Sequence, residues 1–181
     1  MLDALARPGT VTRFPSDVPG VVRLRIDAMA VVHQDPAVGL DLRVSAGGNI
    51  AERLTAAGWR GYRAIRRRAA KLLDRVEVPL SRMDDPVHTF SGGERQRVNL
   101  AAGTVRPPRL LLLDEPVSAL DPANREAALE LVDSLAGQGV AVLAVFHDMD
   151  AIRRLASRVV FVGDGRIARQ GAPDRMLEAA A

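Results

Sequence analysis

The sequence of 181 residues contains no cysteine, one lysine and six aromatic residues. The absence of cysteine excludes disulfide bonds and thiolate metal sites, and it is typical of proteins in a reducing compartment. With so few aromatic rings, the interior must be built from aliphatic side chains, which are abundant because 48% of the residues are hydrophobic. The apolar runs are short, as at residues 110–113, and fall far below the roughly 20 residues of a membrane-spanning helix.

The positive charge of the chain is carried almost entirely by arginine, which supplies 24 of the 25 basic residues, and the formal net charge is only +3. The run Arg66-Arg67-Arg68 could contact nucleic acid or lipid headgroups. A solvated helix face is the simpler interpretation of such a run. We therefore expect no direct binding of nucleic acid.

The most informative segment reads Ser-Gly-Gly-Glu-Arg-Gln-Arg from Ser91 to Arg97. Ser91 is a favourable helix N-cap, and Glu94 three residues later completes the pattern of a capping box. The serine hydroxyl, the unhindered N–H groups of Gly92 and Gly93, and a helix N-terminus together suit a triphosphate. The alternative is an ordinary helix cap that contains glycine.

Polar side chains also follow two apolar runs that predict neighbouring strands. The continuous run 110–113 predicts a strand covered on both faces and is followed by Asp114 and Glu115. Residues 140–146 predict a second buried strand, followed by His147. Ligands of α/β folds bind where strands end, so the two carboxylates could hold Mg²⁺ and orient an attacking water. An ordinary strand end and a structural histidine are the alternatives.

The rest of the chain favours an α/β fold with a parallel sheet and an inserted helical lobe. Amphipathic patterns predict two helices in the lobe, with Trp59 and Tyr62 packed inside it. Two more helices and a hairpin around Gly163-Asp164-Gly165 follow. The predicted elements are a helix end at 1–8, strands at 9–14 and 21–32, lobe helices at 49–57 and 60–76, later helices at 122–136 and 149–156, and hairpin strands at 159–162 and 166–169. We predict that the chain has three parts. Residues 1–37 form the front of the α/β core, residues 38–104 form the helical lobe, and residues 105–181 form the back half of the core.

Over roughly residues 9–170, the order and spacing of these motifs resemble ABC-type ATPases. The resemblance implies a partial P-loop NTPase core with a parallel sheet and an inserted helical lobe. It also implies a role for each site residue. Gln34 would be the Q-loop glutamine that lies near Mg²⁺, and Ser91, Gly92 and Gly93 would be the signature that closes on ATP held by another subunit. Asp114 would be the magnesium residue and Glu115 the general base. Asp121 would be the D-loop aspartate of the dimer interface, and His147 would be the switch histidine.

A narrower resemblance concerns phosphonate breakdown. The segments 33–36 and 44–50 resemble one nucleotide-binding subunit of the carbon–phosphorus lyase system, and 97–101 and 145–148 resemble its second such subunit. Peptide importer ATPases have similar motifs. The resemblance implies ATP and Mg²⁺ as cofactors and a second ABC ATPase subunit, identical or different, as partner. It leaves open a membrane permease or a soluble carbon–phosphorus lyase complex, and it implies a cytoplasmic location, peripheral to the membrane with a permease.

One part of the family pattern is missing. No G-x-x-x-x-G-K-[ST] occurs, because the only lysine, Lys71, has no glycine near it. That loop supplies the backbone cradle and the lysine for the β- and γ-phosphates. We expect it to lie roughly six to ten residues before Met1, in a chain that is N-terminally truncated. We also expect exposed apolar sheet surface and weak or absent ATP turnover by this chain alone.

Two other functions remain open at this point. The chain could be a non-catalytic module that lends Ser91, Gly92 and Gly93 to the ATP site of a complete partner. It could also be a DNA-linked ABC ATPase, as its arginines suggest, although the long coiled coils of such proteins are not found in the sequence.

Overall fold

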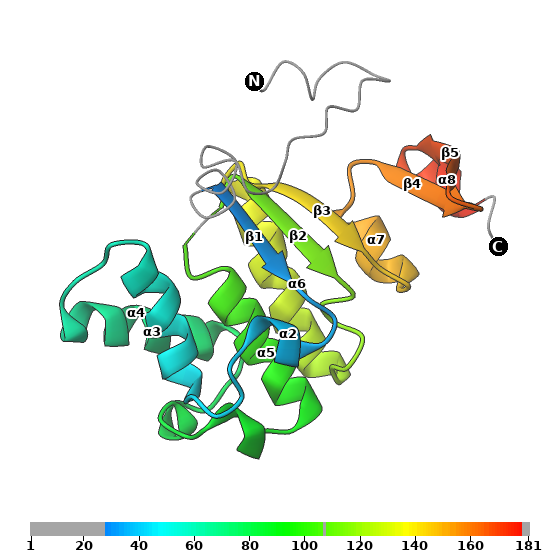
Figure 1. Cartoon of the computed structure of the whole chain (residues 1–181). Helices are drawn as coiled ribbons and strands as arrows, with labels where there is room; N and C mark the ends of the chain where they lie inside the picture. Colours follow the sequence, from blue (N-terminus) through cyan, green and yellow to red (C-terminus); the bar gives the residue numbers. More distant parts are fainter. Residues whose placement is uncertain (1–27, 107, 179–181) are drawn as a thin grey trace.

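The computed structural model describes residues 28–106 and 108–178. The predicted elements at 1–8 and 9–14, and the part of the predicted strand 21–32 before residue 28, lie outside the described residues. In chain order the elements are β1 (Met29–Val32), α2 (Pro36–Gly39), α3 (Ala46–Ala56), α4 (Tyr62–Arg75), η1 (Leu80–Arg82), η2 (Val87–Thr89), α5 (Gly92–Gly103), β2 (Leu110–Asp114), α6 (Pro122–Gly137), β3 (Ala141–Val145), α7 (Met149–Leu155), β4 (Val159–Gly163), β5 (Arg166–Gly171) and α8 (Pro173–Glu178) (Figure 1).

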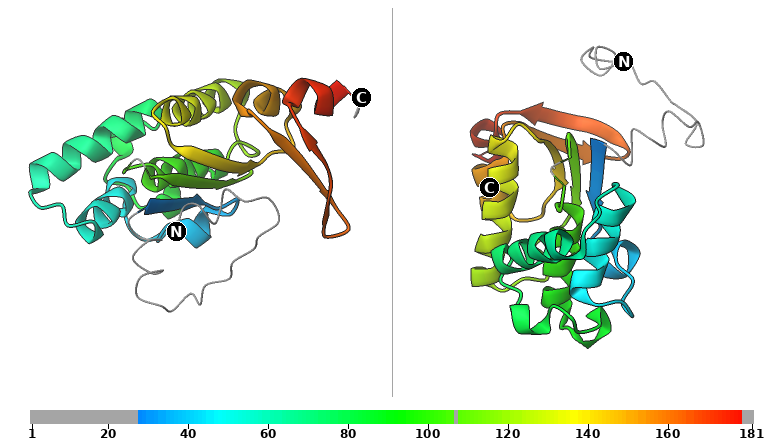
Figure 2. Two further views of the ribbon diagram at one scale, coloured as in Figure 1. Left: turned by 90° about the horizontal axis from the view of Figure 1, so that it is seen from above. Right: turned by 90° about the vertical axis from the view of Figure 1, so that its left-hand side faces the viewer.

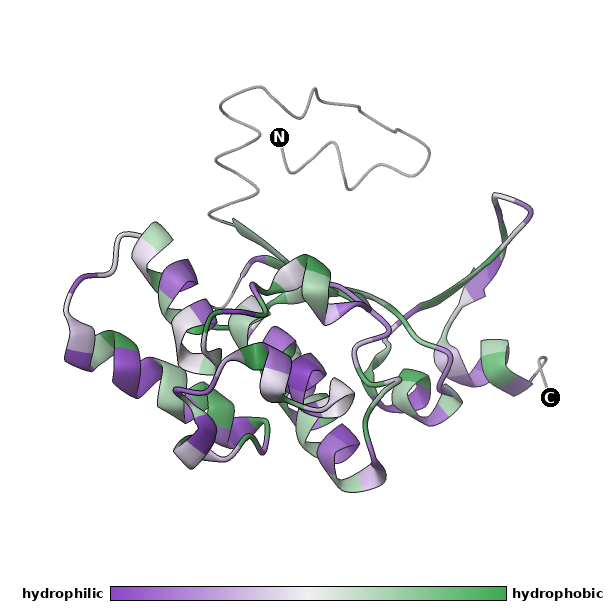
Figure 3. Cartoon of the chain, turned by 60° about the horizontal axis from the view of Figure 1, so that its bottom comes forward, coloured by the Kyte–Doolittle hydropathy of each residue, from purple (hydrophilic) through white to green (hydrophobic). Residues whose placement is uncertain are grey.

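The central sheet is parallel, with strand order β1-β2-β3. Both crossovers therefore step in the same direction across the sheet, and right-handed crossovers place α5 and α6 on the same face. Val32, Leu111 and Leu113 are almost fully buried and join the main core, together with apolar residues of both helices. The strands of this sheet are coloured mainly as hydrophobic in Figure 3.

The other face of the sheet is more open than the sequence predicted. The register places Val31, Leu112 and Leu143 in one row on this face, where Val31 and Leu112 are half-buried and Leu143 is 66% exposed. The predictions that β2 is covered on both faces and that β3 is buried are therefore wrong, because the two crossover helices cover one face only. The prediction of exposed apolar sheet surface is confirmed at β3, where Val145 is also 54% exposed.

The helical lobe contains α3 and α4 and lies at the end of the molecule opposite to the β4–β5 hairpin and α8 (Figure 1). Helix α3 begins three residues earlier than predicted, because the Ser45 hydroxyl accepts a hydrogen bond from the Gly48 N–H at 3.1 Å and caps it. Helix α4 begins at Tyr62, after Gly61 with a positive φ of 97°. Trp59 and Tyr62 are 41% and 74% exposed, so their predicted packing inside the lobe is wrong. The three-part division of the chain stays a prediction.

The elements after residue 109 follow the sequence pattern closely. Helices α6 and α7 agree with the predicted helices to within one residue at each end. The hairpin turns at Asp164 and Gly165, both with positive φ, as a two-residue type I′ turn requires. Figure 2 shows the hairpin projecting from the central sheet. None of the helices in the described part of the chain is both long and apolar enough to cross a bilayer.

The uneven covering of the sheet predicts unequal effects of two leucine truncations. Leu111→Ala removes a fully buried side chain and should lower the free energy of unfolding by about 2–5 kcal/mol. Leu143→Ala, on the open face, should lower it by less than about 1 kcal/mol. Urea unfolding followed by circular dichroism measures both. Equal losses would contradict the assignment of the two faces.

Candidate functional site

Glu115 is the centre of the candidate site. It directly follows β2, and both of its carboxylate oxygens have partners from neighbouring strands. Oε2 accepts a hydrogen bond from Gln34 Nε2 at 3.2 Å, and Oε1 lies 2.7 Å from His147 Nε2. Gln34 follows β1 and His147 follows β3, so the parallel sheet brings the three side chains to one edge. We call these three residues the Glu115 cluster.

The backbone of Glu115 is held in an uncommon conformation. Its φ of 44° lies in the left-handed region, which residues other than glycine seldom adopt. The Glu115 N–H donates to the Val145 carbonyl at 3.1 Å, and the Ser118 hydroxyl donates to the Glu115 carbonyl at 3.1 Å. Residues in such conformations are concentrated at functional sites. The Glu115 side chain is 18% exposed and that of His147 83% exposed, so the carboxylate is enclosed while the imidazole faces solvent.

Asp114 and Gln34 were predicted to hold a metal ion. Asp114 ends β2 and is exposed, and no described residue bonds to its carboxylate or to Gln34 Oε1. Within residues 28–106 and 108–178, no three His, Asp or Glu side chains are grouped so that they could hold a metal. Mg²⁺ is commonly bound by one or two carboxylates together with substrate phosphates rather than by protein ligands alone. This sparse set of oxygens therefore fits a Mg²⁺ that arrives with a phosphate chain.

The start of α5 has the predicted capping box, which confirms the helix start at Ser91. The Ser91 N–H donates to Glu94 Oε2 at 2.8 Å, and the Ser91 hydroxyl accepts from the Glu94 N–H at 3.3 Å. A Cβ added at Gly92 would meet nothing within 4 Å, whereas one at Gly93 would lie 3.0 Å from the Ala119 carbonyl oxygen. Gly92 therefore faces open space, and Gly93 permits close packing against the segment before Asp121.

Arg82 supports this helix start and was not identified from the sequence. Its Nη1 lies 2.8 Å from Glu94 Oε1, its Nε lies 3.1 Å from Asp85 Oδ2, and its guanidinium lies 4.0 Å from the centre of the Phe90 ring. Burial alone would raise the pKa of Glu94, but hydrogen bonds from Ser91 and Arg82 outweigh it and lower the pKa. No sequence pattern links Arg82 to Ser91, because a short 3₁₀ turn and a loop separate them.

Asp121 is the N-cap of α6, which begins at Pro122. Its side chain accepts hydrogen bonds from the Asn124 side chain and from the Asn124 N–H. These bonds, followed by the nearby positive charge of Arg97, lower the pKa of Asp121. Asp121 has no direct contact with the Glu115 cluster among the described interactions.

The structure thus forms two groups from the predicted site residues. Gln34 and His147 each contact Glu115, and Asp114 is adjacent to Glu115 in sequence. Ser91, Gly92, Gly93 and Asp121 belong to the start of α5 and the loop packed against it. A small cavity of ≈ 170 Å³ lies between the groups and is lined by Gln34 and Gly92, among others.

Comparisons with known proteins show which proteins this chain is similar to. Residues 7–118 match the family model described as ABC transporter. The chain is 43% identical over 157 residues to PhnK of Escherichia coli, described as a phosphonates utilization ATP-binding protein, and the match covers 86% of this chain and 62% of PhnK. It is 32% identical to a peptide import ATP-binding protein of Brucella abortus, with 86% and 48% covered. The chain therefore spans less than two thirds of the length of these relatives.

Solved structures of ATP-binding cassettes are also similar to this chain. The dimeric ATP-binding cassette MJ0796 bound to ADP and Pi superposes with a TM-score of 0.79 at 26% identity, covering 87% of this chain and 68% of that chain. CbiO1 of Clostridium perfringens, part of an ABC transporter complex, superposes with a TM-score of 0.72 at 27% identity, covering 92% and 65%. These matches confirm the predicted α/β fold class.

The lowered pKa of Asp121 predicts how its contribution to stability varies with pH. The folded chain keeps this carboxylate charged below the ordinary pKa of 3.8. Its stabilisation is therefore fully present above about pH 3.8 and is lost as the pH falls through the lower folded value. Asp121→Asn keeps a capping oxygen without the charge. The difference between the urea midpoints of wild type and variant should be constant above about pH 4 and should shrink below it. A difference independent of pH would contradict this.

Proposed function

This chain belongs to the ABC transporter family, and from that premise we propose that it is an ATP-binding subunit that couples ATP binding and hydrolysis to a partner. The observation that carries the proposal is the Glu115 cluster, in which residues from three strand ends meet at one carboxylate. Ligands of α/β folds bind at this edge of the sheet. We propose Glu115 and His147 as catalytic residues, and Asp114 and Gln34 as the residues that contact Mg²⁺.

In this mechanism Glu115 accepts the proton of the attacking water, as a general base. Gln34 and His147 each contact one of its oxygens in the structure, and because each carboxylate oxygen can accept a second hydrogen, the carboxylate can still take the proton while it is held in place. When bound, MgATP supplies the phosphate that the water attacks. Gln34 has a free Oε1 with which to contact the metal while its amide nitrogen faces Glu115. His147 is exposed, so it can turn toward a phosphate oxygen.

The second group of residues serves a shared site. Ser91, Gly92 and Gly93 would close on ATP held by another subunit, with Asp121 at the interface between the two. The open space at Gly92 and the exposure of Ser91 support this role. The N–H groups at the start of α5 point outward from the helix and favour an anion. The partner would be a second ABC ATPase subunit, identical or different.

The similarity to PhnK makes phosphonate metabolism the favoured process. Its 43% identity exceeds the 32% of the peptide import relative. We propose phosphonate uptake or carbon–phosphorus lyase metabolism, with a membrane permease or a soluble lyase complex as the driven partner. In either case the protein would act on the cytoplasmic side.

A second candidate function is supported by the start of α5, which has a complete capping box, an exposed Ser91 and open space at Gly92. As a non-catalytic module, the chain could lend Ser91, Gly92 and Gly93 to the ATP site of a complete partner.

The first test adds a G-x-x-x-x-G-K-[ST] segment, a motif that the sequence of 181 residues does not contain. The chain alone should hydrolyse ATP at a rate near background. A chimera with a G-x-x-x-x-G-K-[ST] loop and its preceding strand, taken from a related ABC ATPase and added before Met1, should hydrolyse it. In the chimera Glu115→Gln should lower kcat by about 100-fold or more, measured by phosphate release. Asp164→Asn, in the hairpin turn, is the control that should retain activity. An active Glu115→Gln chimera would refute the assigned general base.

The second test separates the two functions. The full chain is combined with an ABC ATPase subunit of the same organism that has a complete phosphate-binding loop. The ATPase rate of the complex is then measured. If the chain lends its signature, Ser91→Arg should lower the rate about 100-fold by blocking the phosphate contact, whereas Glu115→Gln should leave it unchanged. If Ser91→Arg has no effect in a stable complex, the lending function is ruled out.

A further inference from the structure

The segment that carries Gln34 is attached to α5 by two buried side-chain amides. Asn99 is fully buried and Gln96 is 2% exposed, and both lie on α5. Asn99 Nδ2 donates to the His33 carbonyl oxygen at 2.9 Å, and Gln96 Nε2 donates to the same oxygen at 3.3 Å. His33 is the residue immediately before Gln34. Two buried donors thus hold one backbone carbonyl at the start of the Gln34 segment.

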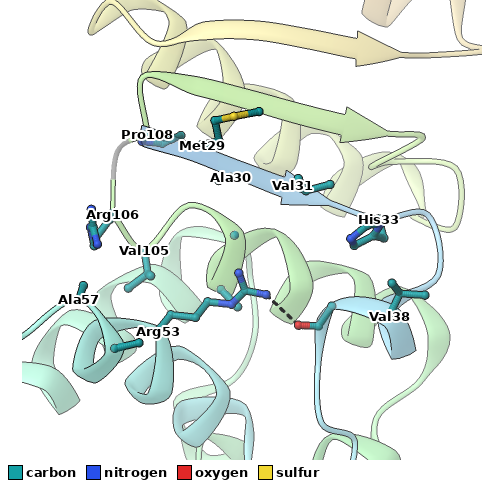
Figure 4. A pocket seen from close by; sticks show the side chains of 14 residues that line it. Met29, Ala30, Val31, His33, Val38, Arg53, Ala57, Val105, Arg106 and Pro108 are labelled. Carbon is teal, nitrogen blue, oxygen red and sulfur yellow. Dashed lines mark hydrogen bonds between the residues drawn. The ribbon is translucent and has the colours of Figure 1, made fainter. Parts of the chain in front are cut away.

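Asn99 also meets the other end of this segment. A Cβ added at Gly39 would collide with Asn99 Oδ1, so the Gly39 backbone passes directly against the amide. The Gly39 carbonyl in turn accepts a hydrogen bond from Arg53 Nη2 of α3 at 2.8 Å, as the dashed line in Figure 4 shows. The side chain of Asn99 therefore contacts both ends of the segment 33–39. Between these ends, Val38 is 65% exposed.

The packing of Asn99 is unfavourable for stability alone. Its Oδ1 is buried without a hydrogen-bond partner, and an unsatisfied buried acceptor is destabilising. An apolar side chain of similar shape would fill the same space without that penalty. The amide is thus better explained by its donor, which fixes the position of His33.

We propose that Asn99 is a positioning residue that ties the Gln34 segment to the signature helix α5. Hydrogen bonds then run from Asn99 to His33, and from the adjacent Gln34 to Glu115. A displacement of α5, as when Ser91 and Gly92 engage a phosphate, moves Gln34 relative to the carboxylate. The catalytic meaning of this link rests on the proposed function, whereas the attachment itself does not.

Spin labels can test the attachment in the full chain, which has no native cysteine that would react. Val38→Cys and Glu130→Cys place labels on two exposed positions, one in the Gln34 segment and one on α6. Asn99→Leu keeps the approximate shape and removes the amide. This substitution should broaden the distribution of distances between the two labels, measured by pulsed electron–electron double resonance. Thr104→Val is the matched control, because Thr104 is buried on the same helix and bonds only within it.

Hydrogen exchange provides the second measurement and detects general unfolding. In Asn99→Leu, amides of residues 33–40 should exchange about tenfold faster, which corresponds to the loss of one or two net hydrogen bonds. Amides of α6 should be unchanged. Gly39→Ala, which pushes the segment away from Asn99 at the other end, should give the same local increase.

The outcomes are distinct. An unchanged distance distribution in Asn99→Leu, or faster exchange spread equally over α6, overturns the proposal. These measurements need no ATP, so a failure to find ATP hydrolysis does not affect them. Conversely, a verified ATPase with a rigid segment in Asn99→Leu overturns the positioning role and leaves the proposed function standing.

Discussion

The hydrogen bonds to the Glu115 carboxylate are the interaction on which the site depends. They exist because three parallel strands end in register, so that the residues after β1, β2 and β3 meet at one edge. In an antiparallel arrangement, neighbouring strand ends would point in opposite directions and the same residues would be separated. The sheet therefore defines the distances in the site, and the short loops after each strand only direct the side chains. The buried leucines of β2 pack against the core on one face of the sheet and stabilise this register.

Two of the polar residues with a proposed functional role also have a local structural role. Ser91 and Asp121 each cap a helix with the side chain that the family resemblance assigns to nucleotide binding or to the dimer interface. Asp148, next to His147, caps α7 in the same way and forms an ion pair with Arg125. Residue identity at such positions therefore cannot distinguish a cap from a site residue. The distinction comes from the cluster around Glu115, where no helix cap requires Gln34 and His147 to contact the same carboxylate.

The order and type of the longer elements could be predicted from local signals, but the short elements α2, η1, η2 and α8 were not predicted. Ser91, Pro122 and Asp164-Gly165 mark a helix start, a second helix start and a hairpin turn, and each effect is decided within a few residues. The covering of β3 could not be predicted in this way, because an apolar run does not state how many of its faces have neighbours. Arg82 and Asn99 were missed for a similar reason. Their partners, Glu94 and His33, lie far along the chain and follow no motif, so only the folded chain places them together.

The left-handed backbone at Glu115 has a consequence for which residue fits the turn after β2. A glycine would adopt that conformation freely and an asparagine more easily than a glutamate. Replacement of Glu115 by either residue would therefore relax the turn after β2 and at the same time remove the carboxylate. The strained glutamate is thus better explained by the contacts of its carboxylate with Gln34 and His147 than by the stability of the turn.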